Sequence, residues 1–230
     1  MSLISIAIAP VAIILFYIYL RDKYEKEPLR SLAAALVSGC LITLPVIYTE
    51  RLLSLPSGNI PAGMASAAYE SVVVAGLTEE FFKFLVFMLL FWNNRQFNET
   101  FDGIVYATFI SLGFALIENI MYVFSQGMGT GMVRAFTAVP AHALFGIIMG
   151  YQFGLARFYP AERIRRIIAA LLLPVILHGI YDFILISRHD LLLLLFIPYI
   201  LFLSVFGFGR MKRLSDRSVY RWISGKRTSR

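Results

Sequence analysis

The sequence predicts an all-α fold, a polytopic bundle of about seven transmembrane helices. The chain has 230 residues, of which 59% are hydrophobic and only 15% are charged. The apolar residues gather into runs of about the length that crosses the hydrocarbon core of a bilayer. Alternation over about ten residues, the pattern of membrane β-strands, is not found. Because a backbone in lipid must satisfy its own hydrogen bonds, we expect these runs to be helices.

Seven apolar segments follow one another, separated by short linkers that carry charges and turn residues. They lie at about 3–20, 31–48, 68–92, 103–124, 132–157, 167–186 and 191–209. The first run lacks the basic start and the small-residue cleavage site of a signal peptide, so we count it as a span. We find no repeat, and the linkers leave no room for a soluble domain. We therefore expect one membrane domain over residues 1–209 and a basic tail over 210–230.

Lysine and arginine residues are distributed unequally between the two sets of linkers. The linkers at 21–30, 93–102 and 157–166, together with the tail, hold 17 of them, whereas those at 49–67, 125–134 and 187–190 hold 3. This asymmetry predicts an N-terminus outside the cell and a C-terminus in the cytoplasm. The tail is expected to contact anionic lipid headgroups. Since no nucleic-acid-binding pattern accompanies it, no nucleic-acid partner is expected despite the net charge of +7.

Several ionisable residues lie inside the apolar segments, where they are costly and usually functional. They are Glu79, Glu80, Lys83, Glu118, His142, His178 and Asp182, with Asn119 beside Glu118. Counted from the outer ends of the predicted spans, the two histidines and two of the acids lie at similar depths, roughly 9–17 Å at about 1.5 Å per residue. The sequence therefore predicts one polar site in the outer half of the membrane.

Spacing along each helix indicates which groups can meet. Glu79 and Lys83 are four residues apart and share a helix face, and so do His178 and Asp182. Glu80 is turned by about 100° from Glu79 and is expected to point elsewhere. A carboxylate behind a histidine fixes its tautomer and raises its basicity, in metal sites and in general-base sites alike.

Each of these residues also has a purely structural interpretation. Lys83 could form only an ion pair, and Asp182 could orient His178 or bind a metal itself. Glu118 and Asn119 could only bridge helices through hydrogen bonds. An isolated buried histidine is usually a satisfied helix contact, but two at the depth of a glutamate pair make that interpretation weaker for His142.

Further expectations concern residues near the ends and in the interior of the predicted spans. Glu70 and Arg134 fall near the outer ends and are expected to be interfacial. Pro140 and Pro174 each come shortly before a histidine, where a proline frees carbonyl groups and bends a helix. A ladder of small residues predicts close helix packing in the fifth segment; it consists of Gly146, Gly150 and Gly154.

Two carboxylates and two histidines around one water favour hydrolysis. In one version Zn²⁺ binds His142, His178 and a carboxylate, Glu80 or Glu118, and another glutamate is the base. In the other version no metal is present, a glutamate activates the water and histidines stabilise the oxyanion. The H-E-x-x-H zinc motif is absent, and Cys40 lies far from the charged residues in sequence.

These motifs resemble the PrsW family of bacterial membrane proteases over nearly the whole chain. The likeness rests on Glu79-Glu80-Phe81-Phe82-Lys83, Glu118-Asn119, Pro140-Ala141-His142, His178-Gly179-Ile180-Tyr181-Asp182, Asp22…Glu27-Pro28 and Phe101-Asp102-Gly103-Ile104-Val105-Tyr106. A more distant likeness is to the type II CAAX-prenyl-protease and bacteriocin-processing group. There the first motif usually ends in arginine one position later and the last often ends in asparagine, so Lys83 and Asp182 favour the PrsW branch.

The resemblance implies a protease of the bacterial cytoplasmic membrane, its protease domain being residues 1–209. It implies the first cut in a membrane-anchored anti-sigma factor on the extracytoplasmic side, which leads to release of a sigma factor under envelope stress. Glu79, Glu80 and His178 then carry over as essential residues and His142 as a second histidine. The family is often labelled metalloprotease. From the residues alone, two other functions stay open: a proton-coupled transporter, and a membrane scaffold that does not cut.

Overall fold

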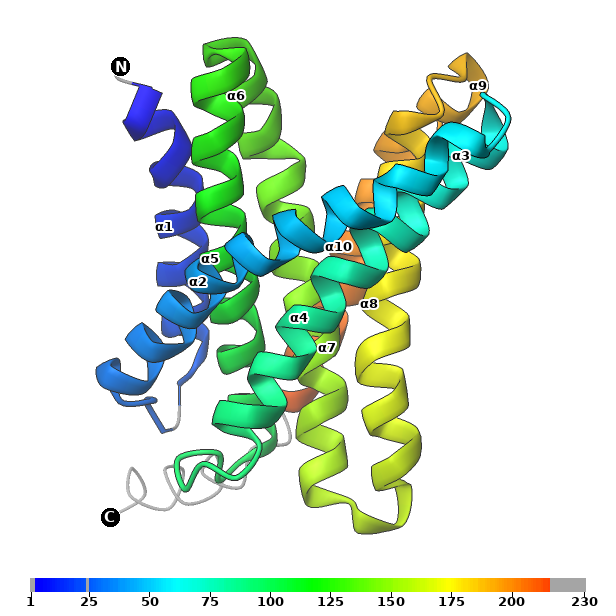
Figure 1. Ribbon diagram of the computed structural model, residues 1–230. Helices are drawn as coiled ribbons and strands as arrows, with labels where there is room; N and C mark the ends of the chain where they lie inside the picture. Colours follow the sequence, from blue (N-terminus) through cyan, green and yellow to red (C-terminus); the bar gives the residue numbers. More distant parts are fainter. Residues whose placement is uncertain (1–2, 24, 216–230) are drawn as a thin grey trace, which may run out of the picture.

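A computed structural model describes residues 3–23 and 25–215, and these residues are helical throughout apart from short turns and linkers (Figure 1). The first helices are α1 (Leu3–Arg21), α2 (Leu29–Ser54) and the 3₁₀ turn η1 (Leu55–Asn59). They are followed by α3 (Met64–Ala68), η2 (Tyr69–Leu77), α4 (Thr78–Val86) and η3 (Phe87–Phe91). The chain continues with α5 (Thr100–Gln126), α6 (Met128–Phe136), α7 (Ala138–Phe158), η4 (Pro160–Glu162), α8 (Arg163–Ile186), α9 (Asp190–Leu193) and α10 (Phe196–Ser215).

The predicted fold class is confirmed: within the described residues the chain is a bundle of helices, without strands. Six helical stretches there are long and apolar enough, by length and composition, to cross a membrane. The third predicted span, 68–92, is not among the six. It corresponds to helical turns that run without interruption from Met64 to Phe91 and carry two π-helical stretches, η2 and η3.

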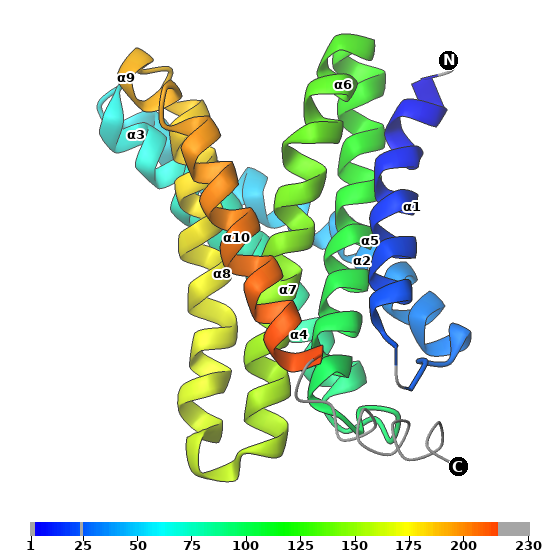
Figure 2. The same ribbon diagram turned by 180° about the vertical axis from the view of Figure 1, so that it is seen from behind.

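The linkers lie at two opposite ends of the bundle, as alternate crossing requires. The start of α1, the α5–α6 turn, α9 and the start of α3 are at one end, labelled N in Figure 1. The α1–α2, η3–α5 and α7–α8 linkers and the end of α10 are at the other (Figures 1 and 2). Residues 210–215 of the predicted tail are the last turns of α10, and the remainder of the tail lies outside the described residues.

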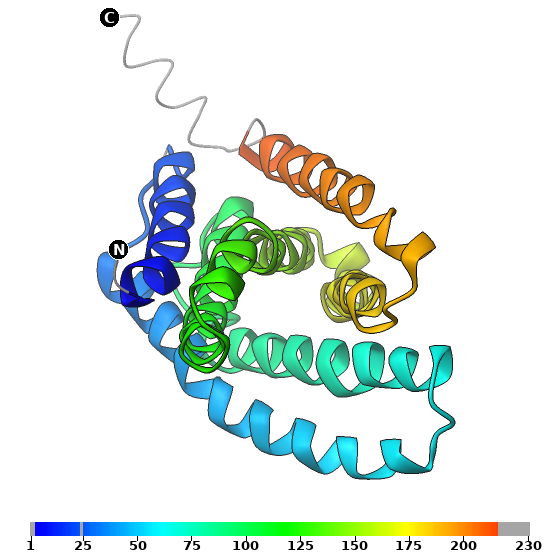
Figure 3. The same ribbon diagram turned by 90° about the horizontal axis from the view of Figure 1, so that it is seen from above.

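Helices α5 and α7 form the centre of the bundle, with α1, α2, α8 and α10 around them (Figure 3). Residues 101–115 of α5 and 141–156 of α7 are all buried. The predicted glycine ladder lies in this interface. A Cβ atom on Gly150 would stand 2.2 Å from the carbonyl oxygen of Gly103, and one on Gly154 would stand 2.1 Å from that of Thr100. Only glycine allows the two backbones to approach so closely.

The fifth predicted span begins earlier than expected and is interrupted. Helix α6 starts at Met128, and α7 follows it after Thr137. Pro140 is therefore in the first turn of α7, where its missing N–H costs no helical hydrogen bond. The expectation that Pro140 bends a continuous span is wrong in this respect: it stands where a helix begins. Pro174, by contrast, lies inside α8.

The linker between α1 and α2 is attached to α5 by a group of buried acids. Glu27 accepts a hydrogen bond from the hydroxyl group of Tyr106, and its own N–H donates to Asp22 Oδ2 at 3.0 Å. Asp102, which also caps the start of α5 by accepting from the N–H of Glu99 at 2.7 Å, lies beside Glu27. Burial raises the pKa of Glu27 to about 7 and that of Asp22 to about 6.

Gly150→Ala is expected to lower the free energy of unfolding by about 1–3 kcal/mol, the usual cost of forcing atoms into a packed interface. The reason is that the new methyl group would overlap the backbone of α5. Thermal unfolding of the purified protein in detergent measures the effect. Gly129→Ala is the control, because an added Cβ there meets nothing within 4 Å. Equal stability of the two variants would contradict the close packing of α5 and α7.

Glu27→Gln is expected to stabilise the protein at pH 8 but not at pH 4. A carboxyl group whose pKa is raised on folding contributes stability below its unfolded pKa, near 4.5, and loses it as the pH rises through about 7. The amide stays neutral, so the variant should gain on the order of 1–2 kcal/mol over wild type at pH 8. Melting curves of both proteins between pH 4 and pH 8 test this; parallel pH profiles would refute it.

Candidate active site

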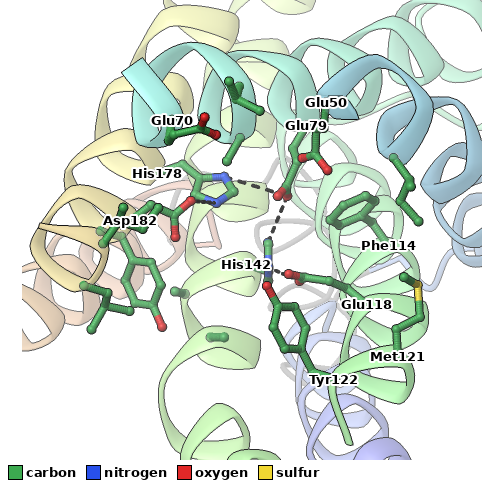
Figure 4. A pocket seen from close by; sticks show the side chains of 18 of the residues that line it. Glu50, Glu70, Glu79, Phe114, Glu118, Met121, Tyr122, His142, His178 and Asp182 are labelled. Atoms are coloured by element: carbon green, nitrogen blue, oxygen red, sulfur yellow. Dashed lines mark hydrogen bonds and ion pairs between the residues drawn. The ribbon is translucent and has the colours of Figure 1, made fainter. Parts of the chain in front are cut away.

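Four side chains from three helices meet inside the bundle. Glu79 and Glu80 come from α4, His142 from α7 and His178 from α8, and all four are buried. One potential ligand atom of each lies within 4.8 Å of the others. In Figure 4, Glu79, His142 and His178 point toward one another at the head of a cavity. The predicted convergence of these residues is thus present in the structure.

The helix that carries the acids is shaped by a π-helical stretch and by a close contact. Stretch η2 ends at Leu77, and the hydroxyl group of Thr78 donates to the carbonyl oxygen of Val73, five residues back, at 3.3 Å. π-Helical turns are rare and often found at functional sites. A Cβ on Gly76 would stand 3.1 Å from the backbone nitrogen of Gly179. The absence of side chains there brings η2 against α8 and places the acids next to His178.

Lys83 joins the two acids. Its ammonium group donates to Glu79 Oε2 at 3.0 Å and to Glu80 Oε1 at 2.7 Å. The expectation that Glu80 points elsewhere is wrong, because residues three apart share a helix face as residues four apart do. The third contact of the ammonium group is His142 Nδ1 at 3.3 Å, and the ring of Phe114 lies 4.4 Å from the nitrogen atom.

Hydrogen-bond partners determine the tautomer of His142. An ammonium group can only donate, so Nδ1 accepts from Lys83 and Nε2 carries the hydrogen atom. Nε2 then donates to Glu118 Oε2 at 2.9 Å. His178 stands between two carboxylates: Nδ1 is 3.0 Å from Glu80 Oε1, and Nε2 is 3.2 Å from Asp182 Oδ2. Both histidines therefore turn Nδ1 toward the glutamate pair and Nε2 toward an outer carboxylate.

The positions of the two outer carboxylates, Glu118 and Asp182, bear on whether they bind a metal ion or support the histidines. Glu118 and Asp182 bond the nitrogen atoms that face away from the centre, so both orient histidines rather than complete the central group. Their side chains are 19% and 20% exposed, against 0% for Glu80. Asn119 has a different position: its amide donates to the carbonyl oxygen of Ala7 at 2.9 Å and ties α5 to α1.

A cavity of about 920 Å³ adjoins the group. Its walls come from α2, η1, η2, α4, α5, α6, α7 and α8. Glu79, His142 and His178 contribute to them, whereas Glu80 does not. The volume is in the range of sites that bind ligands or peptide segments. The walls mix carboxylates with apolar and aromatic side chains, so the cavity can admit a backbone and still hold water near Glu79.

Sequence reasoning missed three residues of the cavity wall. Arg134 lies on the cavity wall, where its guanidinium pairs with Glu118 Oε2 at 2.8 Å and donates to Asn119 Oδ1 at 3.1 Å. Glu70 is likewise on the wall, where it accepts from the hydroxyl group of Ser54 at 3.3 Å. Glu50 of α2, close to Glu79 in Figure 4, was assigned to a linker.

The central group fits a divalent metal ion. Glu79 Oε2 lies 3.9 Å from Nδ1 of His178 and 4.0 Å from Nδ1 of His142, and Glu80 Oε1 lies 3.0 Å from His178 Nδ1. Ligands of a tetrahedral zinc ion are separated by about 3.4 Å, from bonds of about 2.1 Å. Glu80 Oε2 is buried and has no hydrogen-bond partner among the described residues. Outer carboxylates on the far nitrogen atoms are typical of metal-bound histidines.

The comparison with known proteins identifies the family to which the chain belongs. Residues 27–208 match the PrsW family intramembrane metalloproteases. This chain belongs to the PrsW family. It is 40% identical over 188 residues to "Protease PrsW" of Geobacillus kaustophilus, which covers 82% of this chain and 81% of that protein. It is 37% identical to that of Oceanobacillus iheyensis, over 95% of this chain and 99% of the relative.

A third relative, "Protease PrsW" of Bacillus subtilis, is 34% identical over 92% of this chain and 95% of its own length. No solved structure matches the chain. As a PrsW-family protein it is an intramembrane protease, a hydrolase, and a multi-pass protein of a bacterial membrane. Family membership thus selects the protease over the transporter and the scaffold.

Glu118→Ala and Asp182→Ala are each expected to weaken metal binding by about 10–100-fold, since each removes a carboxylate that orients a histidine. Equilibrium dialysis of the purified protein against Zn²⁺, with metal quantified by mass spectrometry, measures the change. Glu162→Ala is the control, because Glu162 pairs with arginines near the opposite end of α8. Wild-type affinity in both cavity variants would show that these carboxylates do not act through the histidines.

Proposed function

We propose that this PrsW-family protein makes the first cut in a membrane-anchored anti-sigma factor, on the extracytoplasmic side of its single span. The observation that carries the proposal is the buried group of Glu79, Glu80, His142 and His178 at the head of a cavity. The family description supports an intramembrane proteolytic reaction. The nature of the substrate rests on the likeness noted from the sequence, and we propose it on that ground.

The side of the cut follows from charge and depth. The linkers rich in lysine and arginine lie at the end opposite the start of α1. By the positive-inside rule, this distribution supports an orientation with the start of α1 outside. Glu118 and His178 each precede the outer end of their helix, Gln126 or Ile186, by eight residues. This corresponds to about 12 Å along the axis. A substrate would thus be cut in the outer half of the membrane. The basic end of the chain would face anionic lipids of the inner leaflet.

In the reaction we assign the general base to Glu79, because it lines the cavity whereas Glu80 is fully buried. Glu79 would take a proton from the attacking water and deliver it to the leaving amine. Glu80 would hold His178 through the 3.0 Å contact with Nδ1. A divalent ion held by His142, His178 and Glu80 would polarise the scissile carbonyl and acidify its water.

Glu79→Ala, Glu80→Ala and His178→Ala are each expected to reduce cleavage by at least about 100-fold while the protein still accumulates in membranes. The assay coexpresses each variant with a tagged single-span anti-sigma factor, follows its length by immunoblot and determines the cut position by sequencing the new N-terminus.

Glu162→Ala should cut at the wild-type rate, since its carboxylate is remote from the cavity. Normal cleavage by all three site variants would exclude the proposed chemistry. A new N-terminus on the cytoplasmic side of the substrate span would instead exclude the proposed orientation.

A further inference from the structure

Lys83 holds the position of a cation at the centre of the site. It is 1% exposed, although a lysine side chain rarely lies buried. An ammonium group has three hydrogen atoms to donate. All three have partners: Glu79 Oε2 at 3.0 Å, Glu80 Oε1 at 2.7 Å and His142 Nδ1 at 3.3 Å.

These partners belong to the group that fits a metal ion. Three of its four members, Glu79, Glu80 and His142, face the ammonium group of Lys83, and the fourth, His178, lies beside Glu80. The lone pair of His142 Nδ1 points at Lys83, as a metal ligand would point at its ion. Lys83 therefore takes the lone pair of His142 Nδ1 and one oxygen atom of each glutamate, all of which a divalent ion could use. An ion bound to His142 Nδ1 and the ammonium group exclude each other.

The electrostatic cost of burying two carboxylates explains why a lysine lies at this position. Two carboxylates taken out of water cost several kcal/mol each unless a cation compensates them. Glu79 and Glu80 are 5% and 0% exposed. The nearest arginine of the cavity, Arg134, is engaged by Glu118 instead. Lys83 contacts both glutamates directly and, together with His178 beside Glu80, compensates their burial.

We propose that Lys83 is a built-in competitor of the metal ion, whose ammonium group must withdraw from Glu79, Glu80 and His142 before a metal can bind them. Lys83 then sets the metal affinity: it lets the site fold and persist without metal, and it weakens binding. The proposal rests on the metal-binding capacity of the site and is independent of the anti-sigma substrate.

A purely structural ion pair leads to different behaviour. If Lys83 only neutralised the glutamates, its removal would damage the protein whether or not metal is present. If it competes with metal, its removal leaves two unpaired carboxylates that a divalent cation can satisfy. The stability of a variant without the ammonium group then depends on metal, because a ligand that binds only the folded state stabilises it.

The test compares wild type with Lys83→Met, which keeps a long unbranched side chain but has no charge. Both full-length proteins are purified in detergent and freed of metal. Zn²⁺ affinity is measured by equilibrium dialysis, and thermal unfolding is recorded with Zn²⁺ and with a chelator. Lys26→Met, in the linker between α1 and α2, is the control for loss of a lysine. The double variant Glu80→Gln with Lys83→Met reports whether binding occurs at this group.

Lys83→Met is expected to bind one Zn²⁺ at least tenfold more tightly than wild type, a difference of about 1.4 kcal/mol. Its melting temperature should rise with Zn²⁺ by more than that of wild type, and the double variant should lose the gain. Affinity equal to or below wild type would overturn the proposal. So would failure of Lys83→Met to accumulate even in cells supplied with Zn²⁺, because a metal should replace the ammonium group. Absence of anti-sigma cleavage would leave these binding results untouched and would refute only the proposed substrate.

Discussion

The burial of two adjacent carboxylates in the membrane interior is the constraint on which the rest of the site depends. Glu79 and Glu80 lie in a low-dielectric environment where unpaired charges are strongly unfavourable. Two groups compensate this charge: Lys83 from the same helix and His178 from α8, which stands between Glu80 and Asp182. The same arrangement concentrates ligand atoms and bases at one point, so the charge compensation and the chemistry have a common origin.

This arrangement needs helices that approach one another closely. Glycines between α5 and α7, and between η2 and α8, remove the side chains that would separate the backbones. His142 of α7 and His178 of α8 can then both lie beside the glutamate pair, while Glu118 of α5 bonds the far side of His142. Close contacts at the centre and a cavity on one side hold the glutamates and histidines in a defined arrangement next to an open space.

Much of this could be predicted from the sequence, because ionisable residues inside apolar segments are conspicuous. The class of fold, the positions of most helices and the residues of the central group followed from that pattern. Arg134 could not be assigned correctly, because its role depends on where α6 begins, and helix ends are the least certain feature of a sequence. Glu50 was overlooked for the same reason: α2 continues to Ser54, so an apparent linker residue lies on the cavity wall.

The sequence by itself determined that the chain is a membrane-embedded helical bundle with buried acids and histidines, since composition and spacing along one helix are local properties. The tertiary structure decided which atoms of these residues meet. Three features depend on contacts between residues as many as 98 positions apart. These are the orientation of each histidine ring, the position of Lys83 between both glutamates and His142, and the separation of Glu118 and Asp182 from the central group. No periodicity in a single helix encodes such contacts, because they follow from how closely neighbouring backbones pack.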